Sequence, residues 1–144
     1  TLPLTLFPYT TLFRSHTMQE RPVYLDLTKI RLPMSAFSSI THRISGMYIF
    51  FITLPLMLYI IDQSISSKAS FERLIIELTS ISAFSIFVFL SISIFWYHIL
   101  TGIRHLVMDF FHIGESLNGS YYSSIFTIVL WIATSLVFFG YLFI

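Results

Sequence analysis

A long run without charged side chains is the strongest constraint in this sequence. Residues 78–103 contain no Asp, Glu, Lys or Arg over 26 consecutive positions. A helix of about 20 apolar residues is long enough to cross the hydrocarbon core of a bilayer. The run therefore predicts a membrane-spanning helix, which we expect to extend from about Glu72 to Asp109 with its span at about 78–108.

Two further stretches are apolar enough to cross a membrane. Residues 44–61 form an uncharged stretch of 18 residues, so we expect the first helix to begin earlier and to span about 35–61, with Pro55 inside it. The third span covers about 121–144, and polar loops are predicted at 62–71 and 112–120. Only 10% of the residues are charged, against about 25% in soluble domains. The sequence thus predicts an all-α integral membrane bundle of three transmembrane helices.

The composition also restricts the chemistry of the chain. The sequence has no cysteine, which excludes disulfides, thiolate ligation of haem and iron–sulfur ligation by these residues. Five histidines are the main candidate metal ligands. The net charge of +1 gives no indication of nucleic-acid binding, and no nucleic-acid partner is expected.

The N-terminal residues fall into two parts. Residues 5–15 resemble the translation of a common sequencing adapter, so residues 1–17 are expected to be an artefact, with a short signal-like leader as the alternative. The membrane-anchor domain is then expected to cover residues 18–144. Its first segment, residues 18–33, is charged and bracketed by Pro22 and Pro33. We expect this segment to lie on the membrane surface or against a soluble partner.

The distribution of basic residues predicts the orientation in the membrane. Four basic residues cluster before the uncharged stretch of the first span, at Arg21, Lys29, Arg31 and Arg43, whereas the 62–71 loop contains only Lys68. Basic residues accumulate on the cytoplasmic side of membrane proteins. The N-terminus is therefore predicted to be cytoplasmic, which places the start of the first span and the end of the second near the same membrane face.

Four positions with a candidate function share one face of the second span: His98, Gly102, His105 and Asp109. Their spacings of four, three and four place them within a stripe about 60° wide. A histidine in an apolar run should face protein, water or a bound group. His98 is thus either an axial ligand of a b-type haem or a histidine bonded to a neighbouring helix. Gly102 either admits a flat macrocycle to the backbone or lets two helices pack closely.

The helix geometry limits how a haem could be held. His98 and His105 lie about 10 Å apart along the helix axis, so they cannot both bind one iron. His42 and His112 are expected near the cytoplasmic boundary and not beside His98. A haem on His98 therefore requires a ligand from a partner chain, or a sixth position that is open or not a histidine.

A second polar group is expected at the cytoplasmic start of the first span. Ser39 and Arg43 share a helix face, and His42 is adjacent to it. A hydroxyl and a cation at this depth suit a quinone carbonyl, although Ser39 considered by itself is more typical of helix packing. Arg43, His42, His105 and Arg104 are candidates to hold anionic groups such as haem propionates. Arg104 by itself is also consistent with an ordinary boundary charge.

Two motifs in these regions resemble those of a known family. The first reads RPxYLDL from residue 21, followed by SxxHRxSG at residues 39–46. The second reads HxxxGxRHLxxD at residues 98–109. Together they resemble the cytochrome b membrane-anchor subunit of succinate dehydrogenase, respiratory complex II, over about residues 18–144.

The resemblance implies a role in a larger complex, in which this subunit is not catalytic by itself. The complex passes electrons from succinate to ubiquinone in the citric acid cycle and the respiratory chain. The implied partners are a second small membrane-anchor subunit, an iron–sulfur subunit, a flavoprotein subunit and the lipid bilayer. No Arg-rich transit peptide follows Met18, so we expect a multi-pass protein of the bacterial inner membrane.

The resemblance also assigns residues to cofactors. It implies a haem b shared between the two anchor subunits, with His98 as the axial ligand to the haem iron from this chain. His42, Arg43 and His105 match residues near the haem propionates, and Ser39 and Arg43 match residues of the quinone site. The alternatives are an anchor of a quinol:fumarate reductase and a structural anchor without haem. A small transporter is disfavoured, because three spans provide no paired broken helices.

Overall fold

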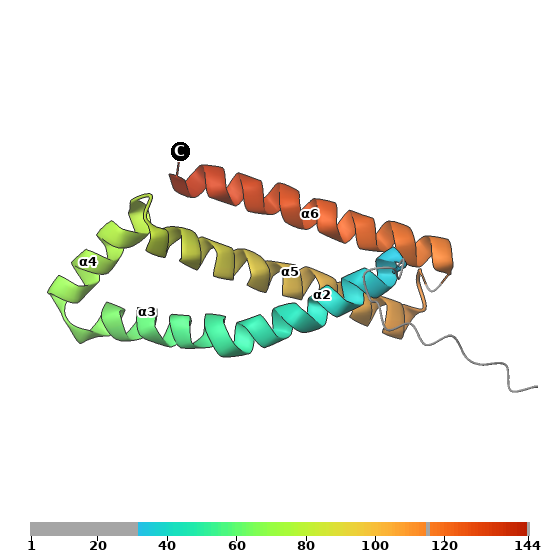
Figure 1. Ribbon diagram of the computed structural model, residues 1–144, viewed down its shortest axis with the longest axis horizontal. Helices are drawn as coiled ribbons and strands as arrows, with labels where there is room; N and C mark the ends of the chain where they lie inside the picture. The colour runs from blue at the N-terminus through green and yellow to red at the C-terminus, as the bar shows by residue number, and fades with distance from the viewer. Residues whose placement is uncertain (1–31, 115, 144) are drawn as a thin grey trace, which may run out of the picture. The chain divides into compact units, whose positions relative to one another are not determined.

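The computed structural model describes residues 32–114 and 116–143, and these fold entirely into helices and short connections (Figure 1). α2 (Met34–Tyr48), the π-helical turn η2 (Ile49–Thr53) and α3 (Leu54–Ser66) form one continuous helix. It is followed by α4 (Lys68–Thr79), α5 (Ala83–Phe111) and α6 (Leu117–Phe143). The predictions for residues 1–17, and for most of the segment 18–33, lie outside the described residues.

Three of these helical segments are long and apolar enough to cross a membrane, at Met34–Ser66, Ala83–Phe111 and Leu117–Phe143. The predicted all-α fold with three spans is therefore confirmed. α2 packs against both α5 and α6, whereas α3 diverges from α5 and is joined to it through α4 (Figure 1). The start of the first span thus meets the end of the second.

The first span widens just before its proline. A proline within a helix lacks an N–H donor, and its ring collides with the carbonyl four residues earlier, which for Pro55 is that of Phe51. Phe51 lies in the middle of η2, the π-helical turn that precedes α3. A wider turn at this point removes the collision while the helix continues across the membrane.

The predicted loop at 62–71 is wrong. α3 continues to Ser66, and only Ser67 separates it from α4. The hydroxyl oxygen of Ser67 accepts a hydrogen bond of 3.1 Å from the backbone N–H of Ser70 and so caps α4. Polar composition alone suggested a loop, but a serine N-cap lets a new helix begin at once.

The prediction of one helix from Glu72 to Asp109 is also wrong, because the chain breaks at Ser80–Ser82. Ser82 and Ser85 form a reciprocal capping box that starts α5: the N–H of Ser85 donates to Ser82 Oγ at 3.0 Å, and the N–H of Ser82 donates to Ser85 Oγ at 2.9 Å. These bonds compete with helix continuation. Serine is uncharged, so the break is invisible in the charge pattern.

The interior of the bundle contains small hydroxylated side chains in place of a large apolar core. Leu74, Val88 and Tyr97 are the buried hydrophobic residues of the described segments. The buried polar residues are Ser38, Ser45, Ser85, Ser91, Ser93, Thr101, Arg104, Ser124 and Thr127. Small residues let membrane helices approach closely, and most of the large apolar side chains are exposed on the outer surface of the bundle.

Candidate functional site

The polar residues singled out on the first and second spans meet in one cleft. It has a volume of about 450 Å³ and lies between α2 and α5. Its lining residues are Ser39, His42, Arg43, His98, Gly102, His105 and Leu106. The cleft therefore brings together candidate residues from both motifs. Two candidates do not line it: Asp109, which is exposed, and Arg104.

Three imidazoles lie together in this cleft. The ring of His42 stacks on that of His98, with centroids 4.1 Å apart and planes inclined by 13°. The centroid of His42 is also 5.4 Å from that of His105. The expectation that His42 lies away from His98 is thus wrong, because the packing of α2 on α5 brings the two rings to the same level.

The three rings do not form a metal site by themselves. Among the described residues, no group of three His, Cys, Asp or Glu side chains is arranged to hold a metal ion. The rings of His42 and His98 lie face to face, so their nitrogens do not point at a common position between them. In this arrangement His42 and His98 would not hold one metal ion together.

The hydrogen bonds of the His98 ring fall on one nitrogen. Nδ1 lies 2.9 Å from Ser45 Oγ and 3.2 Å from the carbonyl oxygen of His42. Nε2 has no hydrogen bond to any residue in the described part of the chain. A ring held through Nδ1 in this way keeps Nε2 available as a ligand atom.

His42 carries a buried nitrogen that the described residues leave unsatisfied. Its Nε2 is buried and has no hydrogen-bond partner among them. Leaving a buried polar group unpaired costs about 1–3 kcal/mol. His42 lines the cleft, so a hydrogen-bonding group that enters the cleft from outside the chain and reaches Nε2 would remove that penalty.

Two glycines make room for the two stacked histidines in a reciprocal manner. A Cβ on Gly46 of α2 would lie 3.1 Å from Cε1 of His98 on α5. A Cβ on Gly102 of α5 would lie 3.4 Å from Nε2 of His42 on α2. In this structure Gly102 accommodates the His42 imidazole, which corresponds to the packing alternative considered for it from the sequence.

Arg104 does not belong to the cleft. Its side chain is 7% exposed and turns toward α6. Nε donates to Ser123 Oγ at 2.9 Å, and one Nη donates to the carbonyl of Ser120 at 3.0 Å. It is therefore neither a boundary charge in water nor a residue facing the His98 cleft. Adjacent helix positions differ by about 100°, so Arg104 and its neighbour His105 face different helices.

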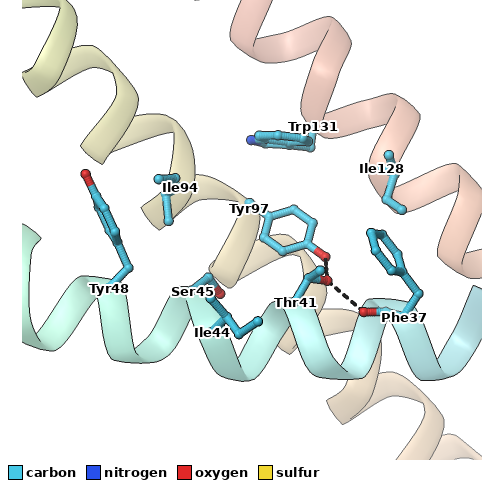
Figure 2. A pocket seen from close by; sticks show the side chains of 9 residues that line it. All are labelled: Phe37, Thr41, Ile44, Ser45, Tyr48, Ile94, Tyr97, Ile128 and Trp131. Atoms are coloured by element: carbon cyan, nitrogen blue, oxygen red, sulfur yellow. Dashed lines mark hydrogen bonds between the residues drawn. The ribbon is translucent and has the colours of Figure 1, made fainter. Parts of the chain in front are cut away.

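A second, apolar cavity was not predicted. Its volume is about 360 Å³, and Figure 2 shows the side chains of α2, α5 and α6 around it. Tyr97 OH lies 2.6 Å from Thr41 Oγ1, which itself donates to the Phe37 carbonyl at 2.9 Å. Trp131 of α6 packs edge-on against Tyr97, so the third span also contributes to this cavity. The helical spacing of Phe37, Thr41, Ile44 and Tyr48 shows that they share the face of α2 that lines this cavity. The sequence could not show which residues of α5 and α6 pack across from this face.

The fold and the cleft define the chain as a multi-pass α-helical membrane subunit. Residues 17–138 match the family model of the succinate dehydrogenase/fumarate reductase transmembrane subunit, and the chain belongs to this family. It is 41% identical over 90 residues to the succinate dehydrogenase cytochrome b556 subunit of Coxiella burnetii (strain RSA 493 / Nine Mile phase I). That alignment covers 62% of this chain and 71% of the relative. The predicted resemblance to the cytochrome b membrane anchor of succinate dehydrogenase is confirmed, and the subunit associates with others of its complex in a membrane.

Proposed function

We propose that this subunit binds the iron of a haem b through His98 Nε2 and shares that haem with a second small membrane-anchor subunit. The arrangement of the His98 ring is the observation that carries the proposal. Nδ1 is engaged by Ser45 and by the His42 carbonyl, and Nε2 remains available. A neutral imidazole in an apolar bundle is a ligand type that haem iron accepts. The cytochrome b556 name of the Coxiella relative agrees with it.

The remaining donors of the cleft fit a haem with its two propionates. Bound haem would supply one-electron redox chemistry. The unpaired Nε2 of His42 offers a hydrogen bond to a carboxylate, and Arg43 brings a cation to the same cleft. His105 also lines the cleft. These three residues would hold the propionates, while His98 would hold the iron.

The second axial ligand would come from the partner anchor. α5 can direct only one histidine at a given iron, and His42 lies face to face with His98. The same partner would cover the open side of the cleft. In the complete complex we place an iron–sulfur subunit and a flavoprotein subunit beside the two anchors, with the N-terminus of this chain cytoplasmic and the complex in a bacterial inner membrane.

Ser39 and Arg43 would form the contribution of this chain to a ubiquinone site. Both line the cleft, and they lie one turn apart on α2, the first part of the first span. The Ser39 hydroxyl and the Arg43 guanidinium can both donate to a quinone oxygen. Arg43 would also stabilise the negative charge that develops on this oxygen during reduction. Electrons from succinate would thus reach quinone at the membrane face of the complex.

The competing assignments use the same residues differently. The family description covers both succinate dehydrogenase and fumarate reductase, so a quinol:fumarate reductase anchor is the alternative in which electrons run in the opposite direction. The name of the relative favours the succinate-oxidising direction. A structural anchor without haem is the other alternative.

An absorption spectrum of the purified complex tests the haem ligand. We expect a low-spin b-type spectrum that disappears in His98→Leu. The control is His112→Asn, which removes a histidine beyond the end of α5 and suits the left-handed backbone there, where φ is 53°. This control should keep the spectrum. A His98→Leu complex that retains a full low-spin spectrum would contradict the proposal.

A further inference from the structure

One part of the SxxHRxSG motif, Ser45–Gly46, contacts the His98 ring but has not yet been given a role of its own. Ser45 is 5% exposed and lies where α2 packs on α5. We propose that Ser45 is a positioning residue that fixes the tautomer and orientation of the His98 imidazole, and that Gly46 provides the space for that ring. This inference rests on the proposed role of His98 as a haem ligand.

The argument begins with the single proton of the Ser45 hydroxyl. Ser45 Oγ lies 2.6 Å from the carbonyl oxygen of His42, which can only accept a hydrogen bond. The hydroxyl proton is therefore donated to this carbonyl. Ser45 Oγ then has only lone pairs to offer to His98 Nδ1, which lies 2.9 Å away.

Both neighbours of His98 Nδ1 are consequently acceptors. The His42 carbonyl oxygen lies 3.2 Å from Nδ1 and also carries no proton. If Nδ1 were unprotonated, its lone pair would face two further lone pairs in a part-buried site. The triangle of contacts is satisfied only when Nδ1 carries the proton. A neutral imidazole protonated at Nδ1 has its lone pair on Nε2, which is the form that binds a metal.

The same segment of α2 also fixes where the ring lies. A Cβ at Gly46 would approach Cε1 of His98 to 3.1 Å, so a side chain there would displace the imidazole. The His42 ring covers one face of the His98 ring at a centroid distance of 4.1 Å. Consecutive parts of α2 therefore hold the ring at its face, at its Cε1 edge and at Nδ1.

The hydrogen bond at Nδ1 should affect the haem directly. An acceptor at Nδ1–H makes the imidazole a stronger electron donor through Nε2, and such contacts to metal-bound histidines typically affect metal affinity by about 10–100-fold. A stronger donor favours the oxidised iron. Removing the Ser45 hydroxyl should therefore raise the haem midpoint potential and weaken haem retention, with the His42 carbonyl left as the remaining acceptor.

The test compares three variants of the intact complex. We expect Ser45→Ala to shift the haem midpoint potential in the positive direction and to weaken haem retention by about tenfold. Ser45→Thr keeps the hydroxyl and should keep the potential of the unmodified complex. The matched control is Ser91→Ala. Ser91 is fully buried on α5, and its hydroxyl lies 3.1 Å from the hydroxyl of Tyr48, the last residue of α2. It removes an α2–α5 hydrogen bond remote from His98, so it should leave the potential unchanged.

The outcomes separate this inference from the proposed function. Ser45→Ala could have the same haem midpoint potential and haem retention as the control Ser91→Ala. Alternatively, Ser45→Thr could shift the midpoint potential as far as Ser45→Ala does. Either result would show that Ser45 does not act through its hydroxyl. In either case His98→Leu would still lose its haem, and the ligand assignment would stand. If instead His98→Leu retains its haem, the proposed function fails, and the positioning role fails with it.

Discussion

Gly46 of α2 and His98 of α5 are in such close contact that a Cβ on the glycine would lie 3.1 Å from the Cε1 atom of the imidazole. The reverse pair, Gly102 of α5 and His42 of α2, has a corresponding distance of 3.4 Å. Each helix thus has a glycine at the position where it contacts the histidine of the other helix. The two pairs differ in how much space they leave, and this difference can be tested.

The two glycines should respond differently to alanine. At 3.1 Å an added methyl forces the His98 ring to move, whereas 3.4 Å is close to ordinary van der Waals contact. We expect Gly46→Ala to lower the haem-to-protein ratio of the purified complex severalfold, and Gly102→Ala to change it much less. Absorbance of the haem relative to total protein measures both. Equal losses in the two variants would contradict the expected difference.

His42 should behave as a propionate contact and not as an iron ligand. Its ring lies on the face of His98, and its Nε2 is buried without a partner among the described residues. We therefore expect His42→Leu to retain a low-spin haem spectrum but to release haem more readily during purification. The comparison is with His98→Leu, which should have no such spectrum. Complete loss of low-spin haem in both variants would assign His42 to the iron.

Ser39→Ala should separate quinone reduction from succinate oxidation. Loss of one hydrogen bond to the quinone oxygen, worth about 1.4 kcal/mol, corresponds to about a tenfold slower reduction of quinone. Oxidation of succinate with a soluble dye takes place at the flavoprotein and should be unchanged. A suitable control is Ser66→Ala in α3, an exposed serine far along the first span. Equal loss of both activities in Ser39→Ala would count against the quinone assignment.

Arg104 should matter for stability and not for the haem. Its guanidinium bonds to Ser120 and Ser123 and thereby ties α5 to α6. Hydrogen bonds between membrane helices contribute about 0.6 kcal/mol each on average, so Arg104→Leu should destabilise the subunit by about 1–2 kcal/mol. Thermal unfolding of the complex in detergent measures this effect. Lys68→Ala serves as the control, because its ion pair with Glu72 is largely exposed at 3.7 Å. A large change in the haem spectrum of Arg104→Leu would contradict the α6-facing role.

Much of the architecture was predictable because its causes are local. Apolar runs of sufficient length identify the three spans, and a helical repeat places His98, Gly102 and His105 on one face. The helix boundaries at Ser67 and Ser82 were missed. Their caps depend on the hydrogen bonds of single serines, which a pattern of charge and hydropathy does not register.

The sequence by itself determined that the chain has three membrane-spanning helices, and it predicted that the start of the first span and the end of the second lie near the same membrane face. Only the tertiary structure decided that His42 stacks on His98, that Arg104 turns to α6, and that Tyr97 and Trp131 border an apolar cavity. These relations depend on how α2, α5 and α6 pack. That packing is set by small side chains distant in sequence, so no local pattern contains it.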